Sequence, residues 1–188
     1  MNPWQLPQRA QIGQNTYDLN TDYRDILEIF RYLEDPDLPE YIRWQIALGL
    51  FYRQSVPDGD MAQAIEYLCQ FIRCGQQEST PAPKLLDWQQ DAPLIIADIN
   101  AAAGQEIRSV PYLHWWSFMA WFYAIGQGQL STVVTIRQKL ATGRKLESWE
   151  QTYYRQNRQI VELPKRYSRQ ELQQKQQLEA LLDTSKGR

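Results

Sequence analysis

The sequence has few of the residues that bind metals or form disulfide bonds. Among its 188 residues are one histidine and two cysteines, Cys69 and Cys74. On a continuous helix, two residues five apart point to different faces, so this pair suits neither a disulfide bond nor joint metal coordination. We expect two reduced, mostly buried thiols, no metal and no cofactor.

Features that define several common functional classes are also missing. No glycine-rich loop follows a strand-like stretch, which argues against dinucleotide and triphosphate motifs. The formal net charge is −2, so the whole chain gives no electrostatic reason to bind DNA or RNA. No apolar run reaches the roughly 20 residues that cross a bilayer, and no signal peptide is visible. We therefore expect a cytoplasmic protein without nucleic-acid or membrane partners.

Aromatic residues are plentiful, and they concentrate in residues 109–126. Ser109 can cap a helix there, Pro111 fits the first helical turn, and Gly126 is typical of a left-handed helix end. Only two side chains between these ends are clearly polar, so the predicted helix is apolar on nearly all faces. Such a helix is either enclosed by other elements or completed by a partner.

Apolar residues recur at helical spacing along most of the chain. The predicted helices cover residues 21–34, 39–52, 61–74, 92–103, 109–126, 131–140 and 146–160. Asn20 or Thr21 is expected to cap the first helix and Asp91 the fourth. The second helix has apolar residues on two faces, which predicts deep burial. Alternation on both sides of the turn at 13–16 predicts a short hairpin.

The predicted fold is therefore all-α. We expect a single compact bundle of about six to seven helices, with a short N-terminal β-hairpin and a helical or frayed C-terminal tail. Residues 1–20 form the arm with the hairpin, 21–167 the helical domain, and 168–188 a glutamine-rich helix or tail. Ser168 and Glu171 have the spacing of a capping box at its start.

Residues that could carry catalysis have stronger structural interpretations. His114 has no evident nucleophile or orienting group, and a lone histidine on an apolar helix usually hydrogen-bonds a carbonyl. Asp87 and Asp91 could divide acid and base roles, but Asp91 is placed to cap a helix. The acidic turn at 34–37 lacks calcium-loop spacing, so a solvated turn is expected. We therefore expect no enzymatic activity.

Residues 144–169 are rich in basic side chains, with Trp149, Tyr153 and Tyr154 among them. A basic face with interleaved aromatics can stack and hold nucleic acid. Acidic residues on the same face favour an ordinary amphipathic helix with its aromatics toward the core. A basic ridge for an acidic protein partner remains an alternative.

Several segments carry a resemblance to a known family. They are YDLNTDYR (17–24), DWQQDAPLI (87–95), IRSVPYLHWWSF (107–118), STVVTIR (131–137) and KLESWE (145–150). The chain resembles the bacteriophage "gene product fifteen" family of tailed phages and prophages of Gram-positive bacteria, over about residues 10–168. The tryptophan-rich string is the most specific part.

The resemblance implies a tail assembly chaperone that binds the tape measure protein and assists tail-tube assembly without catalysis. The major tail protein is a further partner, and self-association is left open. Such a chaperone works in the host cytoplasm and is absent from the mature virion. The alternative is a structural minor tail or connector component of the virion.

An aromatic groove could serve such a client. We hypothesise that part of the aromatic helix and the helix at 146–160 border it, although burial in the core is the stronger interpretation of the tryptophans. The partner-binding residues predicted from the sequence are Trp115, Trp116, Trp121, Trp149 and Tyr153.

Overall fold

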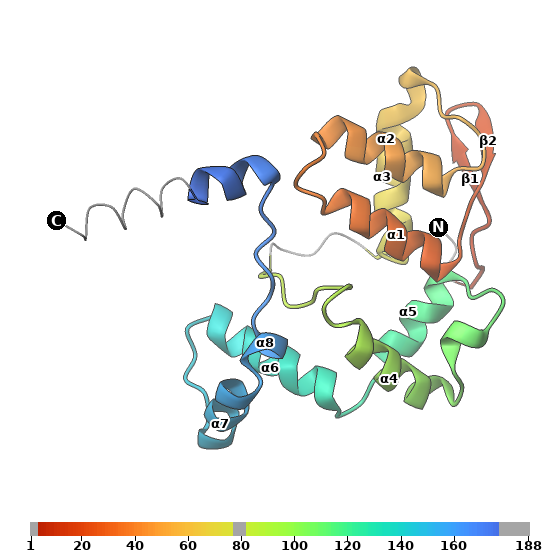
Figure 1. The fold of residues 1–188 in the computed structure, drawn as a ribbon. Coiled ribbons are helices and arrows are strands. Elements are labelled where there is room, and N and C mark those ends of the chain that lie inside the picture. The colour runs from red at the N-terminus through yellow and green to blue at the C-terminus, as the bar shows by residue number, and fades with distance from the viewer. Residues whose placement is uncertain (1–3, 77–81, 177–188) are drawn as a thin grey trace.

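The computed structural model describes residues 4–76 and 82–176, and this part of the chain is mostly α-helical (Figure 1). The strands are β1 (Arg9–Ile12) and β2 (Asn15–Asp18). The helices are α1 (Tyr23–Leu33), α2 (Glu40–Phe51), α3 (Met61–Ile72), α4 (Ala92–Ala103), α5 (Trp115–Tyr123), α6 (Gln129–Ala141), α7 (Ser148–Gln156) and α8 (Arg158–Val161). Short 3₁₀ turns cover Asp58–Asp60 and Ile107–Ser109.

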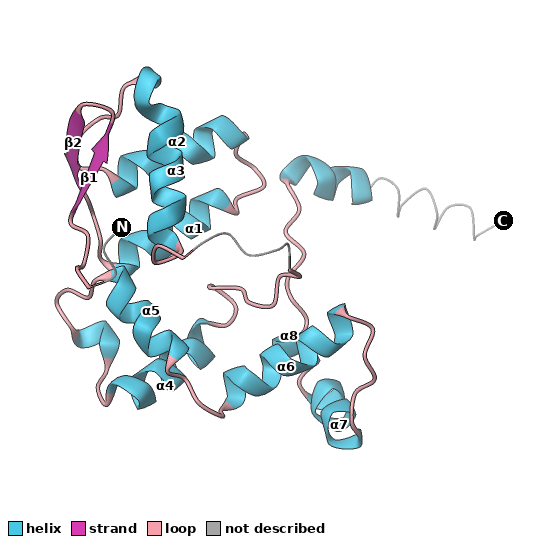
Figure 2. Ribbon diagram, turned by 180° about the vertical axis from the view of Figure 1, so that it is seen from behind, coloured by secondary structure: helices cyan, strands magenta, loops and turns pink. Residues whose placement is uncertain are grey.

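The hairpin and α1 to α3 form one group, α4 and α5 lie below it, and α6 to α8 lie to one side (Figures 1 and 2). The predicted mostly helical fold with an N-terminal hairpin is confirmed. β1 and β2 pair antiparallel, and the edge of the Tyr17 ring packs against Tyr52, with ring centroids 5.4 Å apart. The hairpin thus rests on the helices, as a two-stranded sheet must.

The cap of α1 differs from the prediction. Asp22, not Asn20 or Thr21, accepts the hydrogen bond from the Arg24 amide at 2.9 Å. Its second carboxylate oxygen accepts from the Leu113 amide at 3.0 Å. The start of α1 is therefore bonded to the segment that precedes α5.

The aromatic helix is shorter than predicted and begins at Trp115 rather than near Ser109. Residues 110–113 are not helical because this segment pairs with the start of α1: the Tyr23 amide donates to the Leu113 carbonyl, and the Trp115 amide to the Thr21 carbonyl. His114 is the cap, and its Nδ1 accepts from the Trp116 amide at 3.0 Å.

Helix α5 is largely enclosed in the main core. The Tyr23 ring stacks on Phe118 with centroids 4.7 Å apart, and Trp115 stacks on Phe118 at 5.4 Å. Aromatic pairs of this kind add about 0.5–1.5 kcal/mol beyond their buried area. For most of this helix, other elements of the same chain provide the enclosure.

A second, smaller hydrophobic cluster joins α6 to α8. Val133, Ile136 and Val161 are its buried members, and Leu94 of α4 packs against both this cluster and the main core. The single helix predicted over 146–160 is in fact two, because Asn157 leaves the helical conformation and separates α7 from α8.

The prediction that Asp91 caps α4 is also wrong. Asp91 lies at the cap position, but no amide of the helix donates to its side chain; its carboxylate is fully buried and pairs with Arg137 of α6. Gly104 ends α4 with a φ of 67°, as predicted.

The C-terminal part begins a new helix. The predicted capping box is present: the Ser168 amide donates to the Glu171 carboxylate at 2.7 Å, and residues 169–176 are helical. Leu178, Leu181 and Leu182, the next apolar residues of the glutamine-rich segment, lie outside the described residues.

Candidate functional site: apolar surfaces between the helices

Two of the predicted partner-binding residues belong to the core. Trp115 is 1% exposed and Trp116 9% exposed. Their indole Nε1–H groups donate to the carbonyls of Ile72 and Phe71, each at 2.9 Å. These hydrogen bonds attach α5 to the C-terminal end of α3, so both tryptophans stabilise the fold and offer little surface to a partner.

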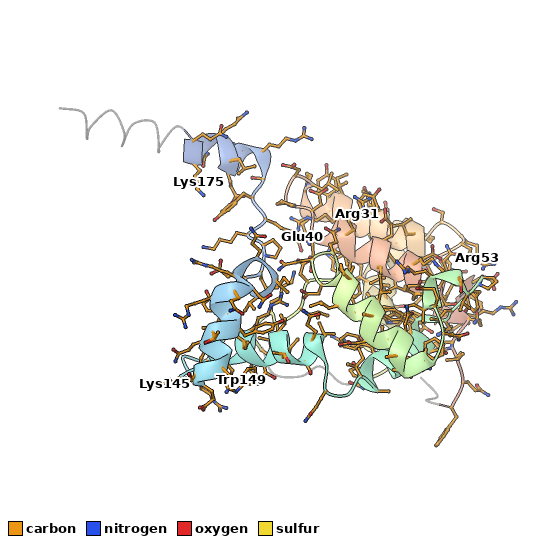
Figure 3. All side chains as sticks on the ribbon, turned by 60° about the horizontal axis from the view of Figure 1, so that its bottom comes forward. Arg31, Glu40, Arg53, Lys145, Trp149 and Lys175 are labelled. Carbon is orange, nitrogen blue, oxygen red and sulfur yellow. The ribbon has the colours of Figure 1, made fainter. Side chains whose placement is uncertain are left out.

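The other three predicted residues lie in different places. Trp121 is half-buried against the main core, and Tyr153 packs on the second cluster. Trp149 is 58% exposed and lies beside Lys145 near the start of α7, well away from Glu40 (Figure 3). The structure therefore does not bring the five residues together in one groove.

A shallow hollow does flank α5. Leu6, Trp116, Met119, Ala120 and Tyr123 contribute to its wall, and its volume is about 350 Å³. No residue of α7 lines it, so the predicted pairing of α5 with the helix at 146–160 is not what forms this hollow.

Cys74 also lines the hollow beside α5. Burial raises the pKa of its thiol to about 11. The thiol is therefore protonated at neutral pH and is a weak nucleophile.

The larger hollow lies between α2 and α3, and we call it the α2–α3 groove. It has a volume of about 520 Å³ and is lined by Glu40, Tyr41, Trp44, Gln45, Met61 and Ile65. Gln45 and Met61 also line an adjoining hollow of about 320 Å³, which reaches Gly49 and Asp58. The two hollows therefore lie next to each other along α2.

The sequence did not predict this groove, because apolar residues on two faces of α2 indicated deep burial. Only Ala47, Leu48 and Phe51 of α2 are buried, and Tyr41 is 66% exposed. The apolar residues on both faces were the signal, since a helix that is apolar all round needs cover on every side. What the pattern could not show is that the N-terminal part of the stripe, at Tyr41, is left open.

The carboxylates considered for catalysis or cation binding have structural partners. Asp87 accepts from the amides of Gln89 and Gln90 and pairs with Arg166 at 2.8 Å. Burial alone would raise the pKa of Asp87, but the Gln90 amide and the Arg166 guanidinium outweigh it and lower that pKa.

The acidic turn is paired with basic side chains. Glu34 contacts Lys84 at 2.8 Å and Arg166 at 3.2 Å, and Asp37 contacts Arg169 at 3.4 Å. Among residues 4–76 and 82–176, no group of three or more potential ligand side chains could hold a metal ion. In the same part of the chain, no helix is long and apolar enough to span a bilayer.

The fold and surface define a mostly helical protein with solvent-facing apolar hollows beside and between its helices. The chain belongs to the bacteriophage Gp15 family, because the family model described as "Bacteriophage Gp15 protein" matches residues 4–163. No curated protein and no solved structure matches the chain.

Proposed function

We propose that the chain is a non-catalytic tail assembly chaperone that binds the tape measure protein in the host cytoplasm and is absent from the mature virion. The observation that carries this proposal is membership of the bacteriophage Gp15 family over residues 4–163. The major tail protein is the second partner in this proposal, since a chaperone of this kind joins the tape measure to tail-tube assembly.

The physical character of the described surface supports this proposal. A chaperone for a long amphipathic helix needs hollows with aromatic or flexible apolar walls and polar rims. It also needs modest affinity at each site and many bound copies, because it must later be displaced. The α2–α3 groove and the hollow beside α5 have such walls.

Co-expression with the cognate tape measure protein tests the proposal. We expect the chain to keep the tape measure soluble and to co-purify with it. Mass spectrometry of purified phage particles should not detect the chain. If the tape measure stays insoluble and the chain is found in particles, the chain is a structural tail component instead.

The predicted role of α7 can be examined in the same assay. Trp149 is exposed and lies outside the main core, so Trp149→Ala should leave the fold intact. Loss of co-purification in this variant would place α7 in the client interface, and unchanged co-purification would remove Trp149 from it.

A further inference from the structure

We propose that the α2–α3 groove is the docking site for an amphipathic helix with an apolar stripe bordered by lysine and arginine. This inference rests on the proposed function, since it names the kind of client segment that the chaperone would hold. It adds the surface, the conformation of the bound segment and the sign of its charge.

The first observation is that one apolar stripe of α2 is buried toward its C-terminal end but open toward its N-terminal end. Leu48 and Phe51 on this stripe are buried, whereas Tyr41, seven residues before Leu48 on the same stripe, is 66% exposed and Trp44 is half-buried. The open part of this stripe, with Tyr41 and Trp44, forms one wall of the groove. Helix α5 is apolar along its length and largely enclosed, so α2 is the helix whose apolar stripe is left for a partner to cover.

The second observation is the shape of the groove. Its walls are side chains of two helices, and an extended peptide would find no strand edge there to pair with. The two adjoining hollows are lined by α2 residues from Glu40 to Gly49, which corresponds to about 14 Å at 1.5 Å per residue. That length fits two to three turns of a partner helix with anchors at positions i, i+3 or i+4, and i+7.

The third observation is the kind of side chain in the wall. Tyr41 and Trp44 are rigid aromatic anchors of the type that dominates binding energy at interfaces. Met61 is unbranched and can adapt its shape to different apolar side chains. The combination suits a series of related helices better than a single small ligand.

The fourth observation is charge. Glu40 and Asp58 are the only charged residues in the walls of the two adjoining hollows, and both are acidic. Neither carboxylate makes an ion pair or side-chain hydrogen bond with the described part of the chain. Complementary charges on the occupant are therefore basic, and the same carboxylates disfavour a nucleic-acid backbone.

The probes are two synthetic amphipathic peptides of about 18 residues, long enough to form a helix on binding. Both carry leucines at i, i+3, i+4 and i+7; one has lysines beside this stripe and the other has glutamates. We expect the full chain to bind the lysine peptide in fluorescence anisotropy and to bind the glutamate peptide at least about tenfold more weakly.

Substitutions in the groove should change this binding in defined directions. Tyr41→Ala should weaken the binding of the lysine peptide at least about tenfold, because the variant lacks an aromatic anchor. Tyr123→Ala is the matched control, because Tyr123 is 61% exposed but lies in the hollow beside α5. Glu40→Lys combined with Asp58→Lys should reverse the preference and favour the glutamate peptide.

A second charge control lies on α3. Glu66 is exposed but does not line the groove, so Glu66→Lys should leave the peptide preference unchanged. Equal binding of both peptides, or weaker binding in Tyr123→Ala than in Tyr41→Ala, would overturn the proposal.

A second copy of the chain is the rival occupant. Helix α7 carries the exposed Trp149 close to Lys145 (Figure 3). Self-association in analytical ultracentrifugation that is abolished by Trp149→Ala and also by Tyr41→Ala would assign the groove to another copy and reject the proposal.

Different experimental results would reject the groove as the docking site and the proposed chaperone function. If Tyr41→Ala still solubilises the tape measure protein, the groove is not the client site but the chaperone role stands. If the tape measure is not bound while the lysine peptide is, the groove is a helix site and the proposed client is wrong.

Discussion

His114 connects two separate segments through its two ring nitrogens. Nδ1 accepts from the Trp116 amide, so Nε2 carries the proton and donates to the Pro7 carbonyl at 3.1 Å. Burial lowers the pKa of this imidazole, and the hydrogen bond to Pro7 opposes that effect only in part. The neutral ring is therefore both the cap of α5 and an anchor for the N-terminal arm.

This arrangement predicts a pH dependence of stability. The unfolded imidazole, with a pKa near 6.5, takes up a proton before the folded one does. The free energy of unfolding should therefore fall as the pH drops below about 6.5, until the folded pKa has been passed. Urea denaturation between pH 7 and pH 5 measures this decrease in the free energy of unfolding.

His114→Asn is the matched control, since asparagine can cap the helix but does not titrate. It should remove this part of the pH dependence. The chain has one histidine, so a single NMR imidazole signal reports the pKa directly. A pKa at or above 6.5 would contradict the prediction.

At the scale of single elements, two glycines occupy backbone positions with opposite requirements, so their replacement should have opposite effects on stability. Gly143 follows α6 with a φ of 68°, where its amide donates to the Leu140 carbonyl and the Arg144 amide donates to the Lys139 carbonyl. These bonds form a left-handed helix end. Gly49 lies inside α2 with no atom within 4 Å of an added Cβ.

Replacing each glycine by alanine should therefore shift stability in opposite directions. Gly143→Ala places a residue with a Cβ in the left-handed region and should lower the free energy of unfolding by about 1 kcal/mol. Gly49→Ala removes backbone freedom from a helix interior and should stabilise by about 0.5–1 kcal/mol. Chemical denaturation of the two variants gives both values, and a change of the same sign in both would contradict the explanation.

At the scale of the whole molecule, a buried ion pair links segments that are distant in the sequence. The Arg137 guanidinium contacts both carboxylate oxygens of Asp91, at 2.6 and 2.8 Å. It also donates to the carbonyls of Leu85, Ile160 and Val161. One side chain therefore holds α4, α6 and the end of α8 in place.

We predict that Arg137→Ala will destabilise the fold by about 3–5 kcal/mol, because it leaves the buried Asp91 carboxylate without its cation. Urea denaturation measures the loss. Arg137→Lys keeps the charge but not the two parallel hydrogen bonds, so it should also destabilise, by a smaller amount. A loss below about 1 kcal/mol in Arg137→Ala would show that water replaces the pair.

Local rules and apolar periodicity determined much of the fold. The hairpin, the positions of most helices, the glycine end of α4 and the capping box at Ser168 all follow from hydrogen-bonding needs of nearby residues. The tryptophan-rich string also pointed to the family that the comparison then showed.

Only the tertiary structure decided which apolar surfaces are covered. Backbone hydrogen bonds between residues 21–23 and 113–115 place the start of α5 at Trp115. The Asp91 carboxylate pairs with the buried Arg137 instead of capping α4. The same packing enclosed Trp115 and left Tyr41 exposed. Periodicity shows that a helix has apolar faces, but contacts between segments far apart in the chain determine which face remains for a partner.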